Sequence, residues 1–118
     1  MITHLKPNQI FIFGSNMLGH HYGGAAKQAY DHFGAQVGIG EGLTGQCYAF
    51  PTLDEDMKQV SSTILKAARR NLYKTAEINP DKEFLLTKVG CGIAGFNEAK
   101  MKKLFENAPK NIIKPEGW

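Results

Sequence analysis

Two apolar segments that each run directly into a glycine-rich segment constrain the fold of this chain more than any other feature. The first covers residues 10–13 and leads into the glycine-rich residues 14–24. The second covers residues 84–89 and leads into residues 90–95. A short continuous apolar run is typical of a strand buried on both faces, as in a parallel sheet. A segment of helical composition follows each glycine segment, and this alternation predicts an α/β protein with a largely parallel sheet.

The other segments extend the same alternation. The residues Val60, Ile64, Ala68 and Leu72 recur every four positions, which indicates the buried face of a helix. The acidic residues 54–56 suit the first turn of that helix, and Pro51 is expected to stop the strand before it. Residues 36–46 contain four glycines and are predicted to be irregular. We therefore expect helices over 25–33, over about 54–76 and from the cap Asn97 to Pro109, with further strands over 47–50 and 111–113.

Length and composition limit the class of protein. The 118 residues predict one domain, residues 1–118, and the net charge of +3 permits an anionic ligand. This charge by itself does not indicate a nucleic-acid protein, which would show a clustered, arginine-rich stripe. The local lysine excess over 97–114 is interpreted as a solvated helix face.

Cysteine content and targeting signals suggest a location. The two cysteines, Cys47 and Cys91, form neither a disulfide framework nor a metal-binding spacing, and no cofactor motif is present. Residues 1–9 contain no apolar signal-peptide core, and no apolar run is long enough to span a membrane. We therefore expect a cytoplasmic protein without a metal, a cofactor or a membrane contact.

The two glycine loops predict a site for phosphate groups. In open parallel sheets the ligand crevice lies at the carboxyl ends of the strands, and backbone N–H groups at a helix start attract anions. Two such loops on neighbouring strands would hold a diphosphate between them. The alternative is that both loops are tight turns required by short connections. Residues 90–95 match GxGxxG, but 23 residues follow Gly95, too few for a dinucleotide fold, and the first loop lacks the GK[ST] ending of a P-loop.

The loops also carry a resemblance to a known family. The segment Gly14-Ser15-Asn16-Met17-Leu18-Gly19, followed by Gly23-Gly24-Ala25-Ala26, resembles the first ligand loop of macrodomains. The segment Gly92-Ile93-Ala94-Gly95-Phe96 is similar to the phosphate-binding loop of that family. The chain also resembles bacterial and phage-type proteins with the same GSN and GCGIAGF segments. The resemblance implies a three-layer α/β/α sandwich with a largely parallel, mixed sheet that binds ADP-ribose or a related nucleotide diphosphate.

This resemblance assigns roles to individual positions. Asn16 would lie beside the distal ribose, Gly23, Gly24 and Ala25 would approach the ribose and the diphosphate, and Phe96 would pack near the ribose. No segment before Ile10 matches the Gly-Asp-Ile segment with which the family binds adenine. The candidate ligand-binding residues are Gly14, Ser15, Asn16, Leu18, Gly23, Gly24, Ala25, Gly90, Cys91, Gly92, Ile93, Ala94, Gly95 and Phe96.

Catalysis is an open question at this point. Asn16 is a candidate for positioning water, Glu41 for a general base and His21 for an acid or base. The alternative interpretation is that Asn16 is a turn residue and that the other two are surface side chains. Cys91 is interpreted as a packing residue rather than a nucleophile. The chain would then hydrolyse an ADP-ribosyl linkage or a phosphoester. Without catalysis it would be a reader or sponge of a nucleotide signal, with an ADP-ribosylated macromolecule as a partner. Further alternatives are an enzyme acting on another phosphorylated small molecule, and an interaction domain.

Overall fold

Strands and helices alternate along most of the chain. The computed structural model describes residues 4–118. Residues 1–3, the start of the segment 1–9 in which we expect no signal peptide, lie outside the described residues. The elements, in chain order, are β1 (Gln9–Asn16), α1 (Gly24–His32), β2 (Gly42–Thr44), β3 (Cys47–Leu53), α2 (Ser62–Glu77), β4 (Glu83–Leu86), α3 (Glu98–Leu104) and β5 (Ile112–Ile113).

The five strands form one mixed sheet in the order β2-β3-β1-β4-β5. The central strand β1 pairs in parallel with β3 on one side and with β4 on the other, and β5 pairs in parallel with β4. The edge strand β2 alone is antiparallel to its neighbour. The prediction of an α/β protein with a largely parallel, mixed sheet is therefore confirmed.

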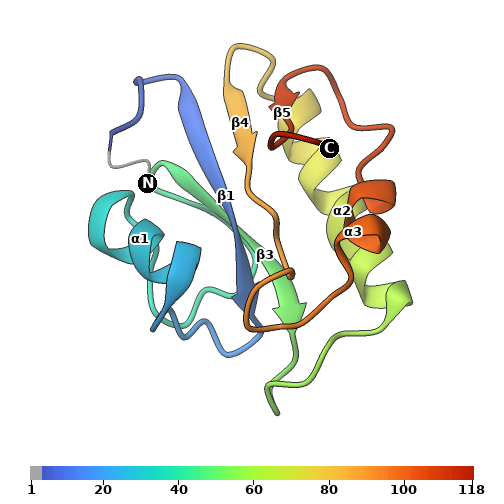
Figure 1. Ribbon diagram of the computed structural model, residues 1–118. Coiled ribbons are helices and arrows are strands. Elements are labelled where there is room, and N and C mark those ends of the chain that lie inside the picture. The colour runs from blue at the N-terminus through green and yellow to red at the C-terminus, as the bar shows by residue number, and fades with distance from the viewer. Residues whose placement is uncertain (1–3) are drawn as a thin grey trace.

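Successive side chains of β1 point to opposite faces of the sheet and contribute to two separate cores. Phe11 and Phe13 pack with Ala29 of α1 on one face. Ile10 and Ile12 belong to the larger core on the other face, with residues of α2 and α3. Figure 1 shows α1 on one side of the strands and α2 and α3 on the other. Burial on both faces explains why residues 10–13 are apolar without interruption.

Helix α2 begins later than the acidic residues predict. Its N-cap is Ser61, whose Oγ accepts a hydrogen bond from the amide of Ile64 at 3.2 Å. Asp54 instead folds a turn, since its Oδ1 accepts from the amides of Asp56 and Lys58 at 2.8 and 3.0 Å. The predicted acidic first turn is therefore wrong. Aspartate and serine both cap helices, but aspartate also stabilises turns by bonding to the backbone just ahead of it.

Two further expectations about β2 and β3 are wrong. Strand β3 continues through Pro51, which pairs with Ser15 of β1. Proline is tolerated there because β2 pairs only with Cys47–Ala49, which leaves one side of β3 without a strand partner at Pro51. The segment predicted to be irregular contains β2, a three-residue strand that the two-residue turn at Gly45 and Gln46 folds back onto β3.

Candidate functional site

A cleft of about 590 Å³ lies at the carboxyl ends of the three central strands. Parallel strands end at the same edge of a sheet, so the ends of β1, β3 and β4 lie together there. In Figure 1 these ends point to the bottom of the view, where both glycine-rich loops lie. The described residues that line the cleft are Gly14, Ser15, Asn16, His20, Tyr22, Gly23, Gly24, Ala25, Ala26, Thr52, Leu53, Met57, Thr87, Lys88, Val89, Gly90, Gly92, Ile93 and Ala94.

The start of helix α1 forms one wall of the cleft. Its N-cap is Gly23, which provides no side-chain cap, and its first turn contains no acidic residue. The first helix amide with a backbone acceptor is that of Lys27, which donates to the Gly23 carbonyl at 3.2 Å. The amides of Gly24, Ala25 and Ala26 thus lack intrahelical acceptors, at the positive end of the helix dipole. Their side chains are too small to block an approaching anion.

The second glycine loop forms the opposite wall. Its internal hydrogen bonds use the amides of Cys91 and Gly95, which donate to Lys88 and Gly92 at 3.2 and 3.0 Å. Within residues 4–118, the amides of Gly92, Ile93 and Ala94 donate to no backbone carbonyl. A Cβ placed on Gly92 would meet no atom within 4 Å, so packing does not require glycine there. The loop therefore presents three consecutive amides beside the cleft.

Gly90 has a different role from Gly92. Its φ is +77°, and a Cβ at this position would lie 2.9 Å from the ring of Phe96. The turn therefore requires glycine at position 90 for both conformation and space. The second loop combines a glycine that shapes the backbone with one that leaves room beside it.

Asn16 anchors the loop that follows β1. Its Nδ2 donates to the carbonyl of His20 at 2.8 Å, and its Oδ1 accepts from the His20 amide at 3.0 Å. Both ends of the buried Asn16 amide thus hold the backbone of His20, whose ring lies beside that of Tyr22 with centroids 5.2 Å apart. Asn16 therefore anchors this loop while it lines the cleft together with His20.

The cleft is weakly positive. Lys88 is the only lysine or arginine among the described lining residues, and they include no aspartate or glutamate. The Nζ of Lys88 lies 2.9 Å from Oε1 of Glu98, which is outside the cleft. The hydrogen bond between them raises the pKa of Lys88 and lowers that of Glu98. An anion entering the cleft therefore meets no carboxylate on the described lining, and one cation that is already paired with Glu98.

Exposed apolar side chains surround the cleft. Tyr22 is 76% exposed, Ile93 is 88% exposed, and Met57 is half-exposed with a φ of 60°. They come from three loops that follow β1, β4 and β3. Exposed apolar side chains gathered beside one cleft are typical of surfaces that contact ligands or partners.

The structure brings together most of the predicted ligand-binding residues. Those that line the cleft are Gly14, Ser15, Asn16, Gly23, Gly24, Ala25, Gly90, Gly92, Ile93 and Ala94. Those that do not are Leu18, Cys91, Gly95 and Phe96. Phe96 is 7% exposed and belongs to the larger core. Cys91 packs against the same core, and burial raises the pKa of its thiol, which disfavours the nucleophilic thiolate.

Two candidate catalytic residues lie outside the cleft lining. The Oε2 of Glu41 accepts a hydrogen bond from Nδ2 of Asn71, on α2, at 3.1 Å. The buried ring of His21 lies edge-on to Phe13, and its Nε2 is 2.9 Å from the carbonyl oxygen of Gln36. These side chains hold the 36–41 segment in place.

Sequence reasoning missed several residues of the cleft. Sequence reasoning treats His20, like His21, as an acid or base or as a surface side chain, and it does not place Thr52, Met57, Thr87 or Lys88 on the lining. The signal for Thr87 and Lys88 was their position immediately before the second glycine loop. Thr52 and Met57 join the site only through the pairing of β3 with β1.

Comparison with protein-family models, with curated proteins and with solved structures finds no match for this chain. No helix among the described residues is long and apolar enough to cross a membrane. The described part of the chain also contains no group of three or more His, Cys, Asp or Glu side chains arranged to hold a metal ion.

Proposed function

We propose that the cleft binds a nucleotide diphosphate, ADP-ribose or a close relative, and that the protein acts as a binding module for it. The observation that carries this proposal is the pair of opposed loops. The amides of Gly24–Ala26 and of Gly92–Ala94 lie beside one cleft without backbone acceptors. Oriented amides at a helix start and in a glycine loop are typical partners of phosphate oxygens.

In this proposal the diphosphate lies between the two loops. Lys88 supplies the positive charge, once a phosphate competes with Glu98 for its ammonium group. The ribose next to the diphosphate would meet the loop that Asn16 holds. The nucleobase would contact the exposed apolar group of Tyr22, Met57 and Ile93, since aromatic and apolar side chains offer area to a base.

Binding without turnover is better supported than hydrolysis. A hydrolase needs a group that activates water, and the described cleft lining offers no carboxylate for that role. His20 is the one lining side chain of a type that commonly serves as a general acid or base. A hydrolase acting through His20 is therefore the second candidate, and product formation distinguishes it from a reader or sponge.

We further propose that the chain is a minimal macrodomain-like protein with a three-layer α/β/α arrangement. Support comes from the order of the two loops along the chain and from the position of β1 between β3 and β4. The packing of α1 on one face of the sheet and of α2 and α3 on the other agrees with it. Without the family's early aspartate, adenine recognition would depend on the exposed apolar side chains.

Calorimetric titration with ADP-ribose, ADP, AMP, NAD and ribose 5-phosphate tests the function. We expect binding of the diphosphates and weaker or no binding of the monophosphates. Gly92→Glu and Gly92→Gln form a matched pair, because both add a side chain of similar size into open space and only the first adds negative charge. The glutamate variant should lose at least tenfold more affinity than the glutamine variant. Equal losses, or no response to any diphosphate, would overturn the proposal.

A further inference from the structure

A second groove, of about 500 Å³, lies between helices α2 and α3. In Figure 1 these helices pack side by side, on the face of the sheet opposite α1. The groove shares no lining residue with the cleft between the glycine loops. A ligand of this groove would therefore occupy a separate site from the nucleotide proposed above.

Positive charge is concentrated along this groove. Its lining includes five basic residues and two acidic ones, Glu77 and Glu106, so its net charge of +3 equals that of the whole chain. Both arginines of the sequence are among the five. The basic lining residues are Lys66, Arg69, Arg70, Lys74 and Lys103.

Most of these cations have no partner within the protein. In the described part of the chain, Lys66, Arg70, Lys74 and Lys103 take part in no ion pair and no side-chain hydrogen bond. Arg69 differs, because its Nη1 donates to the carbonyl of Leu104 at 3.0 Å and so fixes the end of α3 beside α2. The groove thus holds its shape with its charges left free for a ligand.

The spacing of the cations on α2 suits a linear polyanion. Lys66, Arg70 and Lys74 are four residues apart, which places them on one side of the helix at a rise of about 6 Å per step. That separation is of the same order as the distance between successive phosphates along a nucleic-acid strand.

We propose that this groove binds the phosphate backbone of a nucleic-acid strand. A protein segment is the weaker candidate, because peptide grooves anchor their partners through apolar pockets, and Leu104 is the only aliphatic residue among the described residues of this lining. Arginine and lysine along a groove, with little apolar surface, are the usual means of holding phosphates without reading bases. The expected partner is therefore recognised by charge and spacing, not by sequence.

Fluorescence anisotropy with a labelled oligothymidylate of about 12 nucleotides tests the proposal on the full chain. Four phosphate contacts to a single strand predict that the Kd rises about 50-fold between about 50 and 200 mM salt. The double variant Arg70→Glu/Lys74→Glu should weaken binding at least tenfold and lower the salt dependence by about half. A duplex of the same length tells whether the groove prefers one strand or two.

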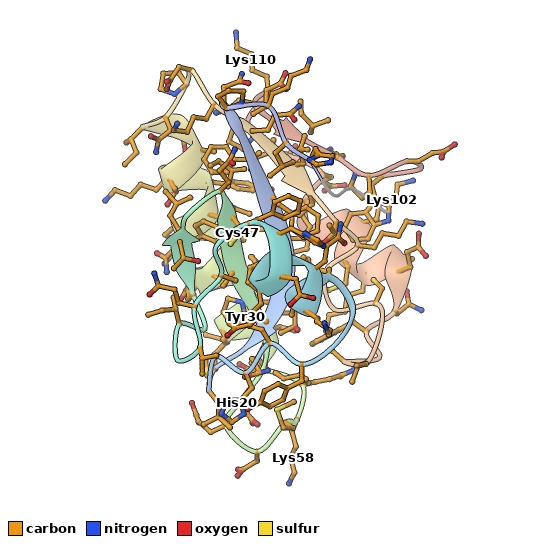
Figure 2. The ribbon with its side chains drawn as sticks, turned by 90° about the vertical axis from the view of Figure 1, so that its left-hand side faces the viewer. His20, Tyr30, Cys47, Lys58, Lys102 and Lys110 are labelled. Carbon is orange, nitrogen blue, oxygen red and sulfur yellow. The ribbon has the colours of Figure 1, made fainter. Side chains whose placement is uncertain are left out.

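The control variant is Lys6→Glu/Lys58→Glu. It lowers the net charge from +3 to −1, as the groove variant does, at two exposed lysines that line neither the groove nor the cleft. Lys58 and His20 both lie at the lower end of the molecule in Figure 2. The control should keep most of the affinity, and Gly92→Glu in the cleft should change it little. Equal losses in both double variants, no binding at low salt, or equal displacement by polyglutamate of the same charge would overturn the proposal.

Discussion

Ile93 reaches across the cleft towards Gly23, so that a Cβ placed on Gly23 would lie 3.8 Å from Cδ1 of Ile93. The two glycine loops thus meet through one apolar side chain that is 88% exposed. A side chain so exposed contributes little to folding, and its position over the cleft suits contact with a bound nucleotide.

We therefore expect Ile93→Ser to separate binding from stability. Its free energy of unfolding should stay within about 0.5 kcal/mol of the wild type, as for other exposed positions. Its Kd for ADP-ribose should rise about fivefold, since the ligand loses roughly 1 kcal/mol of apolar contact. Ile78→Ser is the matched control, because Ile78 is 71% exposed at the end of α2 and lies outside the cleft. An unchanged Kd for Ile93→Ser would show that the ligand does not touch this side chain.

Replacing Asn16 should weaken the loop itself. Asn16→Ala removes both hydrogen bonds to His20 from a buried position, so urea unfolding should report a loss of about 1–3 kcal/mol. Asn71→Ala removes one exposed hydrogen bond to Glu41 and should change stability by less than about 0.5 kcal/mol. If Asn16→Ala lost ligand affinity with no loss of stability, Asn16 would act by touching the ligand rather than by holding His20.

Removing the charge of Lys88 and removing that of Glu98 should change the affinity for a diphosphate in opposite directions. Lys88→Met removes the cation of the cleft and should weaken diphosphate binding about tenfold. Glu98→Gln removes the carboxylate that competes for Lys88 and should strengthen binding a few-fold. Calorimetry at low and high salt checks both variants, because the effect of a charge at an open site falls as ionic strength rises. A loss of affinity in Glu98→Gln would show that the pair positions Lys88 instead of competing for it.

High pH should destabilise the protein through Tyr48. Burial, with a smaller contribution from the charge of Glu41, raises the pKa of this hydroxyl to about 12. The unfolded chain releases this proton near pH 10, so a rise in pH above about 10 stabilises the unfolded state relative to the folded state. The stability that Tyr48 provides is complete below about pH 10 and is lost progressively up to about pH 12, by at most about 3 kcal/mol. Urea unfolding of Tyr48→Phe should show a smaller loss over this range. Parallel curves for the two proteins would contradict the assignment.

The sequence predicts an element correctly where residues next to its ends, such as a capping residue, determine where it begins or stops. Asn97 caps α3 as expected, with its Oδ1 accepting from the Lys100 amide at 3.1 Å. The start of α2 was misplaced because Asp54 and Ser61 are both capping residues, and packing decides between them. Strand β2 was missed because three residues become a strand only through their pairing with β3.

The same distinction applies to the site. The two glycine loops are continuous in sequence, and most of their predicted positions line the cleft. Glu41 was misplaced because its partner, Asn71, is 30 residues away along the chain. The lysine excess over 97–114 was interpreted as a solvated face, and the basic groove was missed because four of its five cations lie on α2 and only the packing of α2 against α3 brings Lys103 to them.

The central position of β1 has a consequence for how this protein tolerates change. The strand is paired on both sides and buried on both faces, so its hydrogen exchange should require global unfolding. The loops that follow β1 and β4 lie outside the sheet, and their amides should exchange through local opening. Loops of other lengths and sequences should therefore be exchangeable onto the same strand ends where the buried anchors Asn16 and Phe96 and their contacts are kept, so that a new ligand preference can be installed with little change in the melting temperature.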